Sequence, residues 1–159
     1  FETLREDVST SAENESSVVL YAFIAERGIL LTGDAGIQAL SDTAAYAESH
    51  AISLPDSLTF VQVPHHGSRN NVSPSVLDRL IGPKTSTAPN GTRLTTFVSA
   101  SKESEIHPRK MVVNGFLRRG ASVMATKGQS IWHHYNMGPR NGWTSLESIP
   151  FSEEVEAWN

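Results

Sequence analysis

Two short motifs, about thirty residues apart, carry the side chains that could do chemistry. Residues 30–36 read Leu-Leu-Thr-Gly-Asp-Ala-Gly, and residues 61–68 read Val-Gln-Val-Pro-His-His-Gly-Ser. Each motif is an apolar, strand-like run that stops at a polar side chain: Asp34 in the first, His65 and His66 in the second. A carboxylate and an imidazole delivered by neighbouring strand ends are ligands for zinc or manganese. The two motifs together therefore indicate a metal-dependent hydrolase.

Asp34 has two interpretations. Gly33 lets the backbone turn sharply at the strand end, so that the carboxylate of Asp34 projects from the edge of a sheet. Its two oxygens can each bind one ion, and two-metal sites hold their ions roughly 3.5–4 Å apart. Alternatively, Asp34 caps the N-terminus of a helix over residues 36–52, which is the commoner use of an isolated Thr-Gly-Asp sequence.

The adjacent histidines favour the metal interpretation. Successive residues of a strand point to opposite faces, so we expect only one of His65 and His66 to enter the site as a ligand. The other is free to pack, to donate a hydrogen bond or to contact substrate. A polar turn after a buried strand is the alternative, but two imidazoles are costly in that position unless they are used.

With both motifs in view, the chain resembles the metallo-β-lactamase superfamily, and most closely its branch of competence-type DNA-uptake proteins and related phosphoesterases. Residues 14–20 resemble the family's Asn-x-x-Ser strand, residues 30–34 its fourth motif and residues 63–68 its fifth. Further elements of that branch are matched downstream, as far as Ile131, by residues 99–101, 107–108, 118–120 and 126–131.

The resemblance implies that Asp34 bridges two divalent ions, zinc or manganese, and that His66 is a ligand with His65 as its neighbour. Two such ions lower the pKa of a bridging water and polarise an ester or phosphoester bond. The resemblance also implies that a phosphate-containing substrate is contacted by His65, Ser68, Arg69 and His107. For His107, which precedes a proline, a helix cap is an equally weighted alternative.

Several departures from the family are equally informative. The sequence has no His-x-His-x-Asp-His cluster and no histidine before Asp34. The third motif, which normally lies upstream of Asp34, is also missing, and Ser101 and Ser104 or their neighbours replace the branch's usual glycine and asparagine. Because the chain begins at Phe1, we expect it to be cut from a longer protein. We expect the C-terminal half of an αββα sandwich that hydrolyses nothing on its own and pairs with its missing half or with a second copy.

The hydrophobic pattern predicts an α/β fold with a mixed sheet flanked by helices. We assign residues 1–140 to this half-domain and residues 141–159 to a tail that packs on it through its aromatic side chains. Strands are expected at residues 17–25, 29–32, 58–63 and 94–99, with a final hairpin of 121–125 and 130–135. Helices are expected at residues 36–52, from Ser73 with Val76, Leu77, Leu80 and Ile81 facing inward, and at 107–119.

Composition narrows the function classes. No apolar run approaches the roughly 20 residues of a membrane span, and no signal peptide is evident, so we expect a cytoplasmic location. The absence of cysteine excludes thiolate zinc sites. Residues 1–68 hold two Arg and ten Asp or Glu, whereas residues 69–140 hold eleven Lys or Arg and three Asp or Glu. Such a basic segment suits nucleic acid, although solvated helix faces explain it more simply.

Two other function classes stay open beside the hydrolase. One is a non-catalytic interaction module, and the other is a nucleic-acid-binding domain that uses residues 69–140. His133 and His134 imitate a metal pair, but adjacent strand residues diverge, so surface or aromatic-packing roles are favoured for them. His50 is expected to face solvent, and the tryptophans are expected to be packing anchors rather than a base-stacking platform.

Overall fold

A five-stranded mixed sheet organises the protein, for which a computed structural model describes residues 3–85 and 93–158. The strands follow one another in chain order, β1-β2-β3-β4-β5. β1 (Leu20–Ile24) runs antiparallel to β2 (Arg27–Leu31), and the remaining strands continue parallel to β2: β3 (Leu58–Gln62), β4 (Leu94–Val98) and β5 (Ala121–Ala125). The predicted α/β class with a mixed sheet and flanking helices is confirmed.

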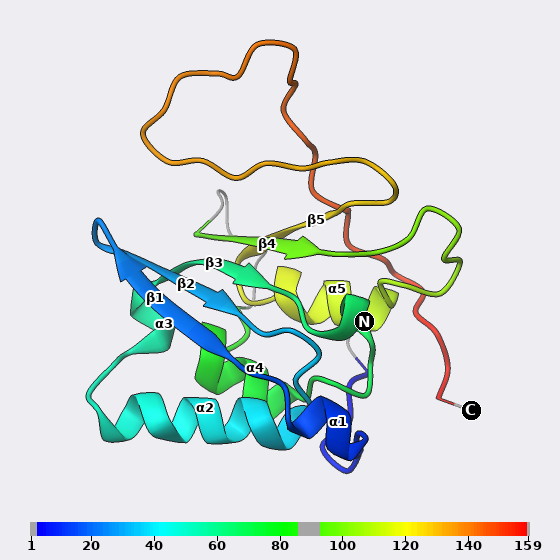
Figure 1. The fold of residues 1–159 in the computed structure, drawn as a ribbon. Coiled ribbons are helices and arrows are strands. Elements are labelled where there is room, and N and C mark those ends of the chain that lie inside the picture. The colour runs from blue at the N-terminus through cyan, green and yellow to red at the C-terminus, as the bar shows by residue number, and fades with distance from the viewer. Residues whose placement is uncertain (1–2, 86–92, 159) are drawn as a thin grey trace.

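The helices that connect the parallel strands lie together on one side of the sheet (Figure 1). α2 (Ile37–Ser49) and α3 (Leu54–Ser57) join β2 to β3, α4 (Pro74–Ile81) joins β3 to β4, and α5 (Lys110–Leu117) joins β4 to β5. Two shorter elements complete the described fold: α1 (Ala12–Glu15) precedes β1, and the 3₁₀ helix η1 (His65–Gly67) follows β3. Each parallel crossover therefore contains a helix that covers the same face.

The turn of the first hairpin lies one residue earlier than the sequence indicated. Ala25 and Glu26 occupy the turn with φ of 50° and 61°, which is the two-residue type I′ geometry preferred in hairpins. Gly28, expected in the turn, instead belongs to β2. A Cβ at Gly28 would lie 2.8 Å from the carbonyl oxygen of Ser57, so this glycine serves a close approach between chain segments.

α4 follows the sequence expectation closely. The Ser73 hydroxyl accepts a hydrogen bond from the backbone N–H of Val76, and Pro74 takes the first helical position. The four apolar side chains predicted to face inward are all buried: Val76, Leu77, Leu80 and Ile81. The cap and the apolar face agree, which is why this element could be read from its sequence.

One predicted element differs in its bounds and one is wrong. The helix expected over residues 107–119 begins at Lys110, because Pro108 biases His107 towards extended backbone and Arg109 is extended as well, with ψ of 135°. Residues 130–135 form no strand beside β5. The free edge of β5 is used by the tail instead: the Ile149 backbone N–H donates to the Val123 carbonyl at 2.7 Å.

The two faces of the sheet differ in burial. On the helix face, Leu30 and Leu94 have no exposed surface. On the other face, residues 129–146 cover part of β3, β4 and β5, as the orange segment opposite the helices shows (Figure 1). The same face of β1 and β2 stays apolar and open, with Leu20 49%, Ile24 63% and Leu31 40% exposed. An apolar surface is thus left exposed over β1 and β2.

The tail of the chain follows the edge of the sheet and then α5. The Asn114 side chain makes two hydrogen bonds with the Ser152 backbone, and the Glu156 carboxylate accepts from the first backbone N–H groups of α5. Trp158 donates to the Thr3 carbonyl, whereas Phe151 is 49% exposed. The tail therefore joins the start of the chain to α5.

No helix among the described residues is long and apolar enough to span a bilayer.

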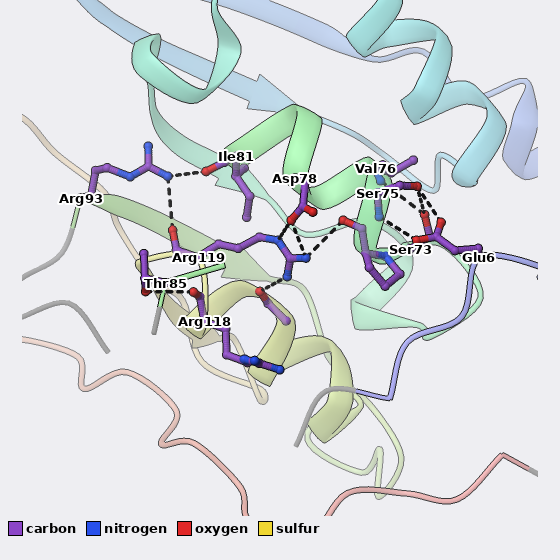
Figure 2. A network of polar contacts seen from close by, with 12 residues as sticks. Glu6, Ser73, Ser75, Val76, Asp78, Ile81, Thr85, Arg93, Arg118 and Arg119 are labelled. Atoms are coloured by element: carbon purple, nitrogen blue, oxygen red, sulfur yellow. Dashed lines mark hydrogen bonds and ion pairs between the residues drawn. The ribbon is translucent and has the colours of Figure 1, made fainter. Parts of the chain in front are cut away.

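A buried arginine holds the helix layer together (Figure 2). The Arg119 side chain has no exposed surface and forms an ion pair with Asp78 of α4 at 2.7 Å. It also donates to the carbonyls of Gly115 at 2.7 Å and Pro74 at 3.2 Å. The Arg93 guanidinium donates to the Arg119 carbonyl from the start of β4. One buried cation thus connects α4, α5 and the segment before β5.

The neighbouring leucines of β2 test which face carries the core. Leu30→Ala should lower the free energy of unfolding by about 2–5 kcal/mol, because it leaves a cavity in a packed interior. Leu31→Ala, on the open face, should change it by less than about 1 kcal/mol. Urea unfolding followed by circular dichroism measures both. Equal losses for the two variants would contradict the assignment of faces.

The buried ion pair gives a second stability test. Asp78→Ala leaves the Arg119 guanidinium buried without its carboxylate and should cost about 2–4 kcal/mol, somewhat less than a fully buried pair because Asp78 is half exposed. Glu48→Ala removes the partner of Arg79 in a solvated pair and should have a much smaller effect. Thermal and urea unfolding compare the two variants. A larger loss from Glu48→Ala would overturn the role given to Arg119.

Candidate functional site

The loops that follow the parallel strands meet at one edge of the sheet. Because β2, β3, β4 and β5 point the same way, their carboxyl ends lie side by side, which is where α/β sheets place ligands. Asp34 follows β2, His65 and His66 follow β3, and His107 lies in the long loop between β4 and α5. The fold thus brings most of the predicted site residues to one region.

Backbone and side-chain hydrogen bonds fix the loop that carries Asp34. The Thr32 hydroxyl donates to the Gln62 carbonyl at 2.8 Å and joins the ends of β2 and β3. The Asn71 amide donates to the carbonyls of Asp34 at 3.0 Å and Ala35 at 3.2 Å. The N-cap of α2 is Gly36, which has no side-chain cap, so Asp34 does not cap this helix. The Asp34 carboxylate therefore has no role in capping α2, and it is 53% exposed.

The rings of His65 and His66 are neighbours in an edge-to-face arrangement. β3 ends at Gln62, and the two histidines belong to η1 with φ of 43° and 56°, so strand alternation does not apply to them. Their ring centroids are 5.6 Å apart. Left-handed backbone at non-glycine residues costs roughly 1–2 kcal/mol each and is concentrated at functional sites.

The two imidazoles differ in their partners. The Nδ1 of His65 lies 4.0 Å from Oδ1 of Asp34 and is buried without a hydrogen-bond partner. The Nδ1 of His66 donates to the Ser99 carbonyl at 2.7 Å, because a carbonyl oxygen can only accept. This bond leaves the Nε2 of His66 as an acceptor, the arrangement by which proteins orient metal-binding histidines. His65 is therefore the nearer neighbour of Asp34, and His66 is the imidazole with an anchored tautomer.

His107 is close to both histidines but is not a helix cap, since the N-cap of α5 is Arg109. Its Nδ1 is buried without a hydrogen-bond partner. Burial lowers the pKa of His107, and the positive charge of Arg109 lowers it further. A hydrogen bond with the Gly67 backbone raises that pKa, and His66 and His65 lower it slightly. The imidazole of His107 is therefore held neutral beside the other two.

A lysine that the sequence did not single out holds the His107 loop. The Nζ of Lys127 donates to the carbonyl of Ser104 at 2.6 Å and to that of His107 at 2.7 Å. Lys127 sits at a Lys-Gly turn with φ of 43°. Nothing in the sequence distinguishes this lysine from a solvated one, because its partners are backbone carbonyls that only the fold brings near.

Ser68 and Arg69 are engaged elsewhere. The Ser68 hydroxyl accepts from the Asn70 backbone N–H at 3.3 Å, a local turn contact. The Arg69 guanidinium donates to the Ala157 carbonyl at 2.7 Å and lies 4.5 Å from the centre of the Trp158 ring. The structure thus directs Arg69 to the tail rather than to Asp34.

The donor set at this edge is small. Among residues 3–85 and 93–158, no three side chains of the metal-binding types converge to hold an ion. The donor types fit zinc or manganese, since the Asp34 carboxylate lies 4.0 Å from an imidazole nitrogen of His65 that has no hydrogen-bond partner. Their number is below the three protein ligands of a usual catalytic zinc.

Several basic side chains of residues 69–140 contact other parts of the same chain. Arg79 pairs with Glu48, and Arg93 donates to the carbonyls of Pro55 and Ile81. Three further members of the segment contact backbone carbonyls or Asp78: Arg69, Arg119 and Lys127. These contacts account for part of the charge block without nucleic acid.

Comparison with models of protein families, with curated proteins and with solved structures found no match to this chain. The resemblance to the metallo-β-lactamase superfamily therefore rests on the motif residues alone and stays a prediction.

The depressed pKa of His107 has a measurable sign. Two-dimensional NMR titration in EDTA should give His107 a pKa below the ordinary 6.5. Since the unfolded chain then binds more protons, His107 should lower stability as the pH falls below about 6.5. Arg109→Gln should raise the pKa of His107, because it removes a nearby positive charge. A wild-type pKa above 6.5, or no rise in the variant, would contradict this electrostatic account.

Proposed function

We propose that this chain contributes part of the active site of a divalent-metal-dependent hydrolase that cleaves ester or phosphoester bonds. The observation that carries the proposal is the approach of Asp34 to His65 at the carboxyl edge of the parallel strands, with the ring of His66 next to that of His65. A buried Nδ1 without a partner on His65 supports it, because such an atom is costly unless something binds there.

In this proposal, Asp34 and one or both histidines hold zinc or manganese. When bound, such an ion lowers the pKa of a coordinated water and polarises the bond to be cleaved. The Ser99 carbonyl accepts from Nδ1 of His66, so that the lone pair of Nε2 remains available to bind the ion. His107, whose pKa is lowered by burial, would donate or accept a hydrogen bond with a substrate oxygen.

The short donor set shapes the rest of the proposal. In this proposal, further ligands come from a second polypeptide segment in the remainder of a longer protein. The open apolar face of β1 and β2 is a surface on which such a segment can pack. Arg69 has no part in substrate binding while the tail occupies it.

A hydrolysis assay with added zinc or manganese tests the function. We expect negligible turnover of bis(p-nitrophenyl) phosphate by these 159 residues alone and metal-dependent turnover by the polypeptide of the full reading frame. In that polypeptide, Asp34→Ala should abolish activity. His66→Ala should lower activity by about two orders of magnitude or more, because loss of even a group that only orients a metal ligand lowers affinity or activity by about 10–100-fold. Asp42→Ala, an exposed carboxylate on α2, is the matched control and should retain activity.

Two results separate the parts of the proposal. Robust turnover by the 159 residues alone, lost on His66→Ala, would overturn the incomplete-site argument and leave the hydrolase. Full activity of Asp34→Ala in the longer polypeptide would overturn the hydrolase site itself.

A further inference from the structure

A cavity of about 660 Å³ lies between residues 129–146 and the face of β4 and β5 that is opposite the helices. Thr95 and Phe97 of β4 and Met124 of β5 line it on the sheet side, and residues from the covering segment line the opposite side. This volume lies in the range of small-molecule sites. The cavity is on a face of the sheet, whereas Asp34 and the histidines of the proposed hydrolase follow the strand ends.

Three aromatic rings and one guanidinium form a cluster at this cavity. Trp132 stacks on His134 with ring centroids 4.4 Å apart and meets Trp143 at 6.3 Å with an interplanar angle of 66°. The Arg140 guanidinium lies 4.4 Å from the centre of the Trp143 ring and 5.3 Å from that of Trp132. Trp143 is 38% exposed, so part of its ring is open to a ligand. The cluster therefore combines a stacking surface with a cation held in place.

The polar character of the cavity selects the charge of its ligand. No Asp or Glu is among the described residues that line it, whereas Arg140 is. His133 packs against Phe60 at 4.8 Å, and burial lowers its pKa, with smaller contributions from His134 and Arg27. A neutral imidazole both donates and accepts hydrogen bonds. The cavity thus offers one positive charge, a neutral polar ring and aromatic faces.

We propose that this cavity binds a nucleotide, with the base stacked on Trp143 and the phosphate at Arg140. Every base presents a flat π-face that stacks on tryptophan, and guanidinium groups bind phosphate oxygens through two parallel hydrogen bonds. His133 and the Gln129 amide are the lining groups that can meet the polar edge of the base. The site needs no metal and does not depend on the proposed hydrolase.

Isothermal titration calorimetry of the full chain in EDTA tests the site with adenosine 5′-monophosphate, adenosine and ribose 5-phosphate. We expect the complete nucleotide to bind, and adenosine and ribose 5-phosphate each to bind at least about tenfold more weakly, since stacking and phosphate contacts both contribute. Trp143→Ala should lower the affinity for the nucleotide and the affinity for adenosine by about tenfold each, because it removes the stacking surface. Arg140→Gln should lower the affinity for the nucleotide about tenfold and leave the affinity for adenosine unchanged, because adenosine has no phosphate.

Two further variants separate a binding role from a structural one. Trp143→Phe keeps an aromatic face and should retain most of the affinity. Trp158→Phe changes a tryptophan at the other end of the molecule, beside Thr3 and Arg69, and should bind as the wild type does. Circular dichroism checks that each variant is folded.

A single-stranded oligoadenylate distinguishes the two sources of a nucleotide. If the oligonucleotide displaces the mononucleotide, the site takes a nucleotide within a strand. If the mononucleotide binds and the oligonucleotide does not, the site takes the free molecule. The absence of measurable binding at millimolar nucleotide, or affinities unchanged in both Trp143→Ala and Arg140→Gln, would overturn the proposal.

Discussion

The close packing of the Gly67 backbone against Pro108 is the constraint on which the carboxyl edge of the sheet depends. A Cβ at Gly67 would lie 2.6 Å from the Cβ of Pro108, and the Gly67 carbonyl accepts from the backbone N–H of Arg109 at 3.0 Å. The loop after β3 is thereby fixed to the residues that open α5. On its other side, the His65 backbone N–H donates to the Gly33 carbonyl at 3.1 Å. Three loops from three strands are thus held in one arrangement, and the site side chains take their positions from backbone contacts.

The helix layer and the tail position this edge from two directions. Arg119 connects α4 and α5 from inside, where its charge is satisfied by Asp78 and by backbone carbonyls. The tail connects α5 from outside, since the carboxylate of Glu156 supplies the N-terminal cap that Arg109 does not. α5 is therefore fixed at both ends by residues distant in the sequence. This explains how a helix of eight residues, too short to be stable alone, can support the loop that carries His107.

Local rules predicted the elements whose signals agree with one another. α4 has its cap, its proline and its apolar face in register, and the strands ending before Asp34 and the histidines are apolar runs bounded by Gly or Pro. The rest depended on contacts between distant residues. The tail, and not residues 130–135, lies along the edge of β5. His65 and His66 lie in a 3₁₀ turn after the strand has ended, so the alternation of side chains along a strand does not predict their directions. His133 and His134 do pack against aromatic rings, as expected, but from a loop.

The backbone of η1 supports the assignment of function to this loop. Two successive non-glycine residues in the left-handed region cost roughly 1–2 kcal/mol each. The backbone of this turn makes hydrogen bonds, including His65 N–H to the Gly33 carbonyl at 3.1 Å and Ser68 N–H to the His65 carbonyl at 2.9 Å. The two imidazoles add little: one hydrogen bond from His66 to a carbonyl, and an Asp34–His65 approach of 4.0 Å, which is too long for a hydrogen bond. Glycine at either position would relieve the strain but would remove an imidazole from the edge of the sheet. In the proposed site, this left-handed backbone presents both imidazoles beside the Asp34 carboxylate, and a bound cation would account for its use here.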